Sequence, residues 1–306
     1  MSSQLSYCKL CGLEDFEDSE LREVMRDVYS GDLREHPDFP TGREHRKFWE
    51  VAMSARALRD FGALRPEAEI LGVGAGREAT IFWLTKHAKR VFATDLYLAD
   101  DSWSVTDSSV EMLIDPARAT GMDWDPQRLV VQHMDALELR YEDESFDGIF
   151  SSGSIEHFGS LDDIRRSVEE MCRVLKPGGV AGISTEFRLE GPPPGMPGTV
   201  MFDEAQLREV VVDGVGWEFA SPLELSVSDA TLATEIDWRS LFEEPPPQPP
   251  STLRQHIRSR LPGRLRWERP EPPPTKHLPT TYPHIVLRLD DLVWTSVHLA
   301  LVKPGS

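Results

Sequence analysis

Short apolar runs alternate with helical patterns through the middle of the chain, and this alternation restricts the folds open to it. The runs that predict strands are residues 70–73, 90–94, 129–134, 146–151 and 180–187. Helical patterns lie between several of them, and the clearest, at residues 162–175, places Ile164, Val168 and Met171 on one face. Strands that alternate with helices through short connections favour a parallel sheet covered on both faces. We therefore predict an α/β fold with a doubly wound sheet.

A glycine-rich turn follows the first of these strands. Gly72, Gly74 and Gly76 precede a helical pattern at residues 78–86. Residues without side chains let the backbone turn tightly and approach a ligand, although such turns also occur for packing alone. Asp95 ends the next strand about 20 residues further on, where doubly wound sheets place a carboxylate against ribose hydroxyls. A solvated strand end is the alternative for Asp95. Together the two features indicate a nucleoside cofactor and leave NAD, FAD and S-adenosylmethionine open.

Further motifs separate these cofactors. The glycine spacing is G-x-G-x-G, whereas dinucleotide sites prefer G-x-G-x-x-G. Asp135 ends the third strand, where a carboxylate can accept a hydrogen bond from an adenine amino group. The fourth strand leads into Ser-Ile-Glu-His at residues 154–157, and the helix after it ends in Leu-Lys-Pro-Gly-Gly at residues 175–179.

In the order and spacing of these motifs, residues 69–185 resemble the class I S-adenosylmethionine-dependent methyltransferases. The resemblance implies a Rossmann-like sheet of seven strands with the last strand antiparallel, which suits the alternating segment 292–302. It implies that the glycine turn cradles the methionine part, Asp95 the ribose and Asp135 the adenine. It also places the helix at residues 44–61 where family members fold a lid. The implied cofactor-binding residues are Gly72, Gly74, Ala75, Gly76, Asp95, Leu96, Asp135, Ala136, Ser151, Ser152 and Trp49.

Three titratable residues are candidates for catalysis. Methyl transfer is an in-line displacement at a sulfonium, so the enzyme mainly aligns the acceptor in a dry pocket. A hydroxyl acceptor also benefits from a base, and a histidine can accept a proton near neutral pH. His157 follows the fourth strand, with Glu156 beside it, and Glu186 ends the fifth strand. The alternative is that Glu156 and His157 only cap the next helix or pack the turn.

The chain divides into four predicted segments. They are an N-terminal helical cap at residues 1–65, a cofactor-binding core at 66–227, a proline-rich substrate or lid insertion at 228–284, and a C-terminal strand at 285–306 that completes the sheet. The insertion holds proline-rich stretches at 245–250 and 270–274 around a basic helical piece at 253–260. With the loop at 100–107, it is expected to build the acceptor pocket.

Composition limits the partners. The 33 Lys and Arg against 52 Asp and Glu give a net charge of −19, which argues against a nucleic-acid substrate. No apolar run is long enough to span a bilayer, and no apolar signal segment follows Met1. Three cysteines favour a reducing cytoplasm. Cys8 and Cys11 form half of a zinc-ribbon pattern, to which His36 or His45 could contribute. A closed zinc site needs four ligands and Cys172 lies far along the chain, so no metal is predicted.

The sequence thus predicts an S-adenosylmethionine-dependent methyltransferase that releases S-adenosylhomocysteine. It is similar to bacterial methyltransferases that act on sugars or small metabolites, which implies O-methylation of a saccharide or glycosylated metabolite hydroxyl. The alternatives are a nicotinamide-dependent oxidoreductase, a macromolecule-directed methyltransferase with a basic docking face, and a non-catalytic scaffold that keeps the fold. The atom methylated and the oligomeric state stay open.

Overall fold

The computed structural model describes residues 5–31, 33, 35–98, 110–241 and 281–305. The predicted loop at 100–107, the proline-rich stretches and the basic helical piece at 253–260 lie outside these residues. No helix in the described part of the chain is both long enough and apolar enough to cross a membrane.

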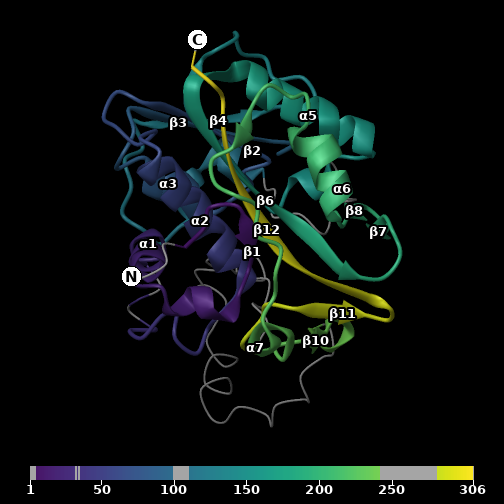
Figure 1. Cartoon of the computed structure of the whole chain (residues 1–306). Coiled ribbons are helices and arrows are strands. Elements are labelled where there is room, and N and C mark those ends of the chain that lie inside the picture. The colour runs from purple at the N-terminus through teal and green to yellow at the C-terminus, as the bar shows by residue number, and fades with distance from the viewer. Residues whose placement is uncertain (1–4, 32, 34, 99–109, 242–280, 306) are drawn as a thin grey trace, which may run out of the picture.

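One large sheet forms the centre of the molecule (Figure 1). Its order is β10–β11–β12–β6–β5–β2–β3–β4. The strands are β2 Glu69–Val73, β3 Arg90–Asp95, β4 Leu129–His133, β5 Phe146–Ser152, β6 Leu175–Glu190, β10 Ile236–Asp237, β11 Leu287–Leu289 and β12 Leu292–Val302. β4, β3, β2, β5 and β6 pair in parallel, and β12 pairs with β6 antiparallel. This confirms the predicted α/β fold and the antiparallel last strand.

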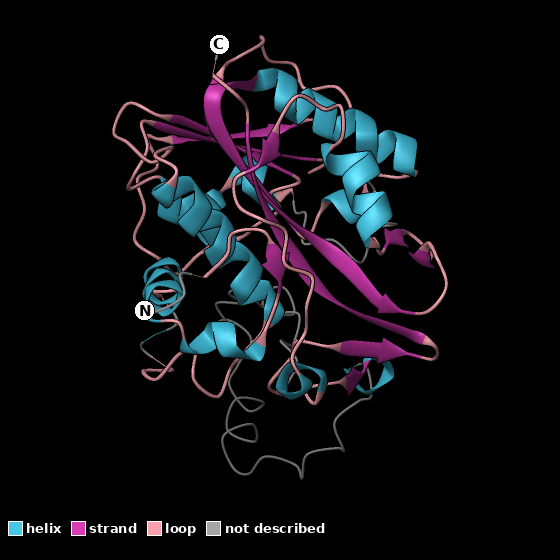
Figure 2. Cartoon of the chain, in the orientation of Figure 1, coloured by secondary structure: helices cyan, strands magenta, loops and turns pink. Residues whose placement is uncertain are grey.

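Helices cover both faces of the sheet (Figure 2). α1 Ser19–Val28, α2 Arg46–Asp60 and α3 Ala79–Leu84 lie on one side, and α5 Leu161–Val174 and α6 Glu204–Leu207 on the other. Strand residues alternate between the two cores: Ile70 packs with α1–α3, and the next residue, Leu71, packs with α5. Smaller elements are η1 Leu13–Glu17, α4 Glu111–Ile114, η3 Pro116–Ala119, η4 Ile155–His157, β7 Gly195–Met196, β8 Thr199–Val200, η5 Arg208–Val212, α7 Asp229–Leu232 and η6 Trp238–Leu241.

The outer edge of β12 carries three short strands in succession. β9 Glu218–Phe219 pairs near its C-terminal end, β1 Lys9–Leu10 in its middle, and β11 near its start. The described part of the sheet therefore has ten strands, not the seven implied by the resemblance. The reason is that β12 is 11 residues long, and its open edge needs partners along its length.

The boundary between α5 and β6 differs slightly from the prediction. α5 begins with a capping box between Ser160 and Asp163 and ends at Val174, as its pattern indicates. The Lys-Pro-Gly-Gly segment that follows is the irregular first part of β6, not a separate turn. Gly178 has a φ of 77°, a conformation in which glycine is favoured.

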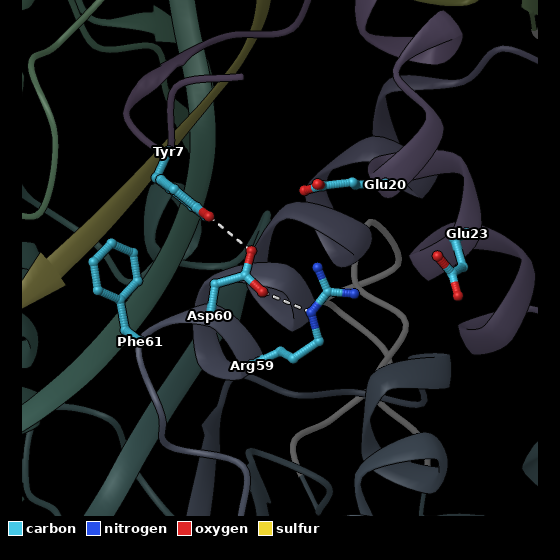
Figure 3. A pocket seen from close by; sticks show the side chains of 6 residues that line it. All are labelled: Tyr7, Glu20, Glu23, Arg59, Asp60 and Phe61. Carbon is cyan, nitrogen blue, oxygen red and sulfur yellow. Dashed lines mark hydrogen bonds and ion pairs between the residues drawn. The ribbon is translucent and has the colours of Figure 1, made fainter. Parts of the chain in front are cut away.

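A surface hollow of about 590 Å³ lies at the C-terminal end of α2 (Figure 3). Its lining residues are Tyr7, Glu20, Glu23, Arg59, Asp60 and Phe61. Asp60 accepts hydrogen bonds from the Tyr7 hydroxyl and from Arg59 Nε, each at 2.7 Å. The rise of an α-helix separates Asp60 from the start of α2 by roughly 20 Å. This hollow is therefore distinct from the site described next.

Candidate functional site

The glycine turn lies at the carboxyl end of β2 and is fastened to β3. Gly74 and Gly76 have φ values of 62° and 51°, in the left-handed region that glycine favours. The Ala75 N–H donates to the carbonyl of Thr94 at 3.0 Å, and the Gly76 N–H donates to Asp95 Oδ2 at 2.8 Å. The predicted turn and its predicted acidic partner are thus joined directly.

At two of these positions, close packing against β5 and the residues after it also requires glycine. A Cβ at Gly72 would lie 2.4 Å from Cζ of Phe150 on the neighbouring strand. A Cβ at Gly74 would lie 2.7 Å from Cβ of Ser154, whose hydroxyl donates to the Gly74 carbonyl at 2.7 Å. A larger side chain at either position would therefore separate the turn from the end of β5.

The remaining predicted nucleoside contacts follow β3 and β4. Asp95 Oδ1 accepts from the Leu96 N–H at 2.6 Å, and Leu96 is 37% exposed. Asp135 is exposed and accepts from the Leu137 N–H at 2.9 Å, while Ala136 is buried. Because β3 and β4 are parallel neighbours, the structure brings Asp95 and Asp135 to the same edge of the sheet.

Ser151, Ser152 and Trp49 lie in different surroundings. The Ser151 hydroxyl is buried and has no hydrogen-bond partner among the described residues, and Ser152 Oγ lies 3.4 Å from Ser54 Oγ. Trp49 is fully buried, and its indole N–H donates to Asp15 at 2.8 Å. This packing ties Trp49 to the N-terminal segment, and its contact with a cofactor stays a prediction.

A buried ion-pair cluster joins the start of α2 to the C-terminal half of β6. Arg46 Nη1 donates to both carboxylate oxygens of Glu186 at 2.7 Å, and to Glu50 at 3.3 Å. Lys47 Nζ lies 3.1 Å from Glu186 and 2.9 Å from Glu50. Burial alone would raise the pKa of Glu186, but Arg46 and Lys47 hold it below its ordinary value. The positive charges of Arg46 and Lys47 therefore balance the negative charges of Glu50 and Glu186 in this cluster.

Two further carboxyl groups adjoin this balanced cluster. Glu156 is 1% exposed; its Oε2 accepts from the Thr185 hydroxyl at 2.9 Å, and its Oε1 has no hydrogen-bond partner in the described part of the chain. Burial raises the pKa of Glu156. Glu78 also has one buried oxygen, Oε1, without a hydrogen-bond partner there. Burial and then the charge of Glu50 raise the pKa of Glu78 well above its ordinary value.

Gly153 is the point at which the cluster meets the end of β5. It has a φ of 60°, and a Cβ there would lie 2.5 Å from Lys47 Nζ, 2.8 Å from Glu50 Oε2 and 3.5 Å from Glu156 Oε1. Glycine thus lets three charged side chains from α2 and η4 converge on the backbone. The cluster consequently lies at the carboxyl end of β5, beside Ser152.

His157 lies next to Glu156 and is partly exposed. Its Nδ1 is 3.0 Å from the carbonyl oxygen of Gly198. A carbonyl oxygen only accepts, so Nδ1 carries the proton of this hydrogen bond, and Nε2 of the neutral ring is left as an acceptor. This is the tautomer that a general base requires.

Two buried histidines hold the start of α2. His45 Nδ1 accepts from the Lys47 N–H at 3.0 Å, and His45 Nε2 lies 2.5 Å from His284 Nδ1. Burial lowers the pKa of both rings, so the pair is neutral, and His45 donates from Nε2. The Arg46 N–H also donates to the His284 carbonyl at 3.0 Å. The segment before β11 therefore fixes the helix end that carries Arg46 and Lys47.

Several site residues were missed by sequence reasoning. They are Arg46, Lys47, Glu50 and Glu78. Of these residues, Glu78 could have been found from the sequence, because it follows the three glycines at the same two-residue spacing. Arg46 and Glu50 are four residues apart on one helix, but an exposed ion pair would have the same spacing. Among the described residues, no group of three or more His, Cys, Asp or Glu could hold a metal ion.

The paired state of Glu186 gives a testable pH dependence. Because its folded pKa lies below the unfolded value of about 4.3, its stabilisation is complete above that value and is lost as the pH falls through the folded pKa. We expect Glu186→Gln to lower the free energy of unfolding by roughly 3 kcal/mol at pH 7. The difference from wild type should shrink as the pH falls from about 4 towards 2.

Urea denaturation at a series of pH values measures this difference. Glu169→Gln is a matched control, because Glu169 pairs with Arg165 on the surface and is 52% exposed. A difference between wild type and Glu186→Gln that stayed constant from pH 7 to the acid limit would contradict the assignment of an ionised, paired Glu186.

The middle of the chain is similar to known methyltransferases. Residues 71–183 match the methyltransferase domain family. Methyltransferase GfsG of Streptomyces halstedii is 32% identical over 47% of this chain and 51% of its own length. The 27-O-demethylrifamycin SV methyltransferase of Amycolatopsis mediterranei is 30% identical over 48% of this chain and 47% of its own. An O-methyltransferase of Pyrenophora dematioidea is 28% identical over 56% of this chain and 59% of its own. The chain thus spans about half the length of these relatives.

Proposed function

We propose that this chain, whose residues 71–183 match the methyltransferase domain family, transfers a methyl group from S-adenosylmethionine to a small molecule. The proposal rests mainly on the hydrogen bond between the glycine turn and the acidic end of β3. The Gly76 N–H donates to Asp95 Oδ2 at 2.8 Å. In doubly wound sheets this combination receives an adenine nucleoside.

The polar atoms around the turn fit such a cofactor. Four buried oxygens lack hydrogen-bond partners among the described residues: Glu78 Oε1, Thr80 Oγ1, Ser151 Oγ and Glu156 Oε1. Buried polar atoms are normally paired, so unpaired ones near the ends of β2 and β5 suit a polar ligand. Asp95 and Leu96 would hold the ribose, Asp135 and Ala136 the adenine, and the turn with Ser151 and Ser152 the methionine part.

When bound, S-adenosylmethionine supplies an electrophilic methyl group on a positively charged sulfur. The chain's own residues must then orient the acceptor, exclude water and accept a proton. His157 Nε2 is the proposed base, because the hydrogen bond from Nδ1 to Gly198 leaves Nε2 free to take the hydroxyl proton. We propose that Glu156 and Glu186 orient the acceptor beside it, with Arg46 and Lys47 holding Glu186 in position.

We further propose that the acceptor is a hydroxyl group of a saccharide or glycosylated metabolite. Two of the relatives carry O-methylation in their names, which supports a hydroxyl acceptor. The net charge of −19 supports an uncharged small molecule over a nucleic acid. The methyltransferase domain match favours this function over a nicotinamide-dependent oxidoreductase.

Ligand binding tests the cofactor first. S-adenosylhomocysteine at 100 times its Kd is expected to raise Tm by roughly 5 °C or more, and NAD at the same concentration should leave Tm unchanged. A screen of saccharides and glycosides with methyl-labelled S-adenosylmethionine then tests the acceptor. Stabilisation by NAD alone, or by neither ligand, would overturn the proposal.

A further inference from the structure

His284 is a buried residue beside the ion-pair cluster that takes no part in the proposed proton transfer. It is 4% exposed and lies in the segment before β11. Two backbone hydrogen bonds fix this segment to the start of α2. The His284 N–H donates to the Glu44 carbonyl at 2.7 Å, and the Arg46 N–H donates to the His284 carbonyl at 3.0 Å. The position of the His284 ring is therefore set by the backbone on both sides.

The contact with His45 fixes where the His284 ring carries its proton. His45 Nδ1 accepts from the Lys47 N–H at 3.0 Å, so the neutral His45 ring has its proton on Nε2. His45 Nε2 then donates to His284 Nδ1 at 2.5 Å. A neutral imidazole has a single N–H, so the proton of His284 lies on Nε2. His284 thus presents a hydrogen-bond donor at the nitrogen that His45 does not contact.

This donor is buried and unpaired. Nε2 of His284 has no hydrogen-bond partner in the part of the chain that the structure describes. The two ring nitrogens flank Cε1, so a ring that turns Nδ1 towards His45 directs Nε2 away from it. Burial lowers the pKa of His284 most, Arg46 and Lys47 lower it further, and Glu186 raises it, so all three charges lie near the ring. Buried N–H groups are normally paired, and this one therefore indicates a missing acceptor.

The charged groups near the ring cannot supply that acceptor. Arg46 and Lys47 carry only donors. Glu186 is already occupied, because Arg46 donates to both of its oxygens at 2.7 Å and Lys47 lies 3.1 Å from one of them. A bound molecule with an oxygen acceptor would pair the His284 Nε2–H.

A second unpaired group near the same charges has the opposite character. Glu156 Oε1 is a buried carboxyl oxygen with no hydrogen-bond partner among the described residues. After burial, which raises the pKa of Glu156, Lys47 lowers it and Glu186 raises it, so Glu156 and His284 both lie near these two charges. A donor and a carboxyl oxygen around one cluster suit a molecule with several hydroxyl groups, because each hydroxyl both donates and accepts.

We infer that His284 is a specificity-determining residue whose Nε2–H donates to a hydroxyl oxygen of the saccharide that is methylated. The inference rests on the proposed function, because it assumes a saccharide acceptor beside the cluster. The hydroxyl that His284 binds differs from the methylated one, whose proton goes to His157. His45 is a positioning residue, because its hydrogen bond keeps the proton of His284 on Nε2.

Deoxy sugars test this contact. The probes are the methyl glycosides of glucose, galactose, mannose and rhamnose with their monodeoxy analogues, and methyl-labelled S-adenosylmethionine is the donor. His284→Asn keeps a polar group near the place of Nδ1 for His45, but its side chain is too short to put a donor at the place of Nε2. We expect this variant to lower kcat/KM for the best glycoside roughly 5- to 20-fold. In wild type, one deoxy analogue should show a similar loss, and His284→Asn should lose nothing further on that analogue.

Two more variants control the experiment. His284→Gln reaches the place of Nε2 with an amide N–H and should keep most of the preference for the glycoside over that analogue. His87→Asn makes the same change as His284→Asn at a ring that is 39% exposed, and should leave kcat/KM unchanged. The Tm without ligand and the Kd for S-adenosylhomocysteine show whether each variant keeps its fold and its cofactor site.

The outcomes separate the two proposals. A loss shared by His284→Asn and one deoxy analogue supports the role of His284. If His284→Asn is as active as wild type, or discriminates against every deoxy analogue as wild type does, that role is overturned and the methyltransferase proposal stands. If His284→Asn is unfolded, the folded His284→Gln decides: a retained preference supports the contact, and a lost one overturns it. If wild type binds S-adenosylhomocysteine but methylates none of the glycosides, the saccharide acceptor and the role of His284 fall together. If it does not bind S-adenosylhomocysteine, the methyltransferase proposal falls as well.

Discussion

Replacing Arg46 by methionine is expected to lower the free energy of unfolding by about 3–5 kcal/mol. Arg46 is 4% exposed and is the cation closest to Glu186, with both oxygens at 2.7 Å. Its Nη1 also donates to Ser296 Oγ at 2.9 Å and to Glu50. Methionine fills similar space but leaves two buried carboxylates with Lys47 as their remaining cation, and an uncompensated buried charge is costly.

The same helix offers a matched control. Arg59→Met removes an arginine that is 38% exposed and pairs with Asp60 at 2.7 Å. A surface pair of this kind contributes about 0–1 kcal/mol, so this variant should stay near wild type. Urea denaturation followed by circular dichroism compares the two. In the double variant Arg46→Met with Glu186→Gln, part of the loss should return, because one stranded charge is gone. Equal small losses for Arg46→Met and Arg59→Met would show that the cluster does not stabilise the fold.

Replacing His157 by alanine is expected to lower kcat by about 10²–10⁴-fold while the Kd for S-adenosylhomocysteine stays unchanged. The reason is that His157 holds its proton on Nδ1 against the Gly198 carbonyl, leaving Nε2 as the proposed proton acceptor. Its ring hydrogen-bonds the Gly198 carbonyl, whereas Asp95 bonds the glycine turn and Asp135 bonds the Leu137 N–H. Turnover with an identified acceptor and calorimetry with S-adenosylhomocysteine measure the two quantities.

His87→Ala serves as the control for this substitution. His87 lies just beyond α3, packs against Trp83 and is 39% exposed, so its loss should leave kcat unchanged. Unchanged turnover in His157→Ala would remove it as the base and leave Glu156 to be tested by Glu156→Gln.

Local patterns in the sequence predicted the sheet and the glycine turn. β2, β3 and β4 are short apolar runs, and neighbouring residues such as Ile70 and Leu71 are both buried because helices cover both faces of the sheet. The turn was predictable because its glycines, its strand and its helix are adjacent in the chain. Asp95 was predictable because a parallel sheet places the ends of successive strands at one edge.

The ion-pair cluster could not be predicted in this way. Arg46 and Glu186 are 140 residues apart, and only the folded sheet brings them together. In the sequence, the apolar residues of 44–61 form one stripe of a helix, and charged residues lie between them. This pattern predicts that the charged side chains face the solvent. Arg46 and Glu50 are buried instead because each has an opposite charge within reach. The same reasoning explains Trp49, whose partner Asp15 lies in η1.

The place of β12 in the sheet also has a consequence for the order in which the chain can fold. β12 lies between β6 on one side and β1, β9 and β11 on the other, and all four precede it in the sequence. Cys8 and Ala300, which form a contact at this edge, are 292 residues apart. A ribosome therefore releases every neighbour of β12 before β12 itself is made. Until then β6 keeps an unpaired edge, the kind of surface to which chaperones and misassembled strands bind.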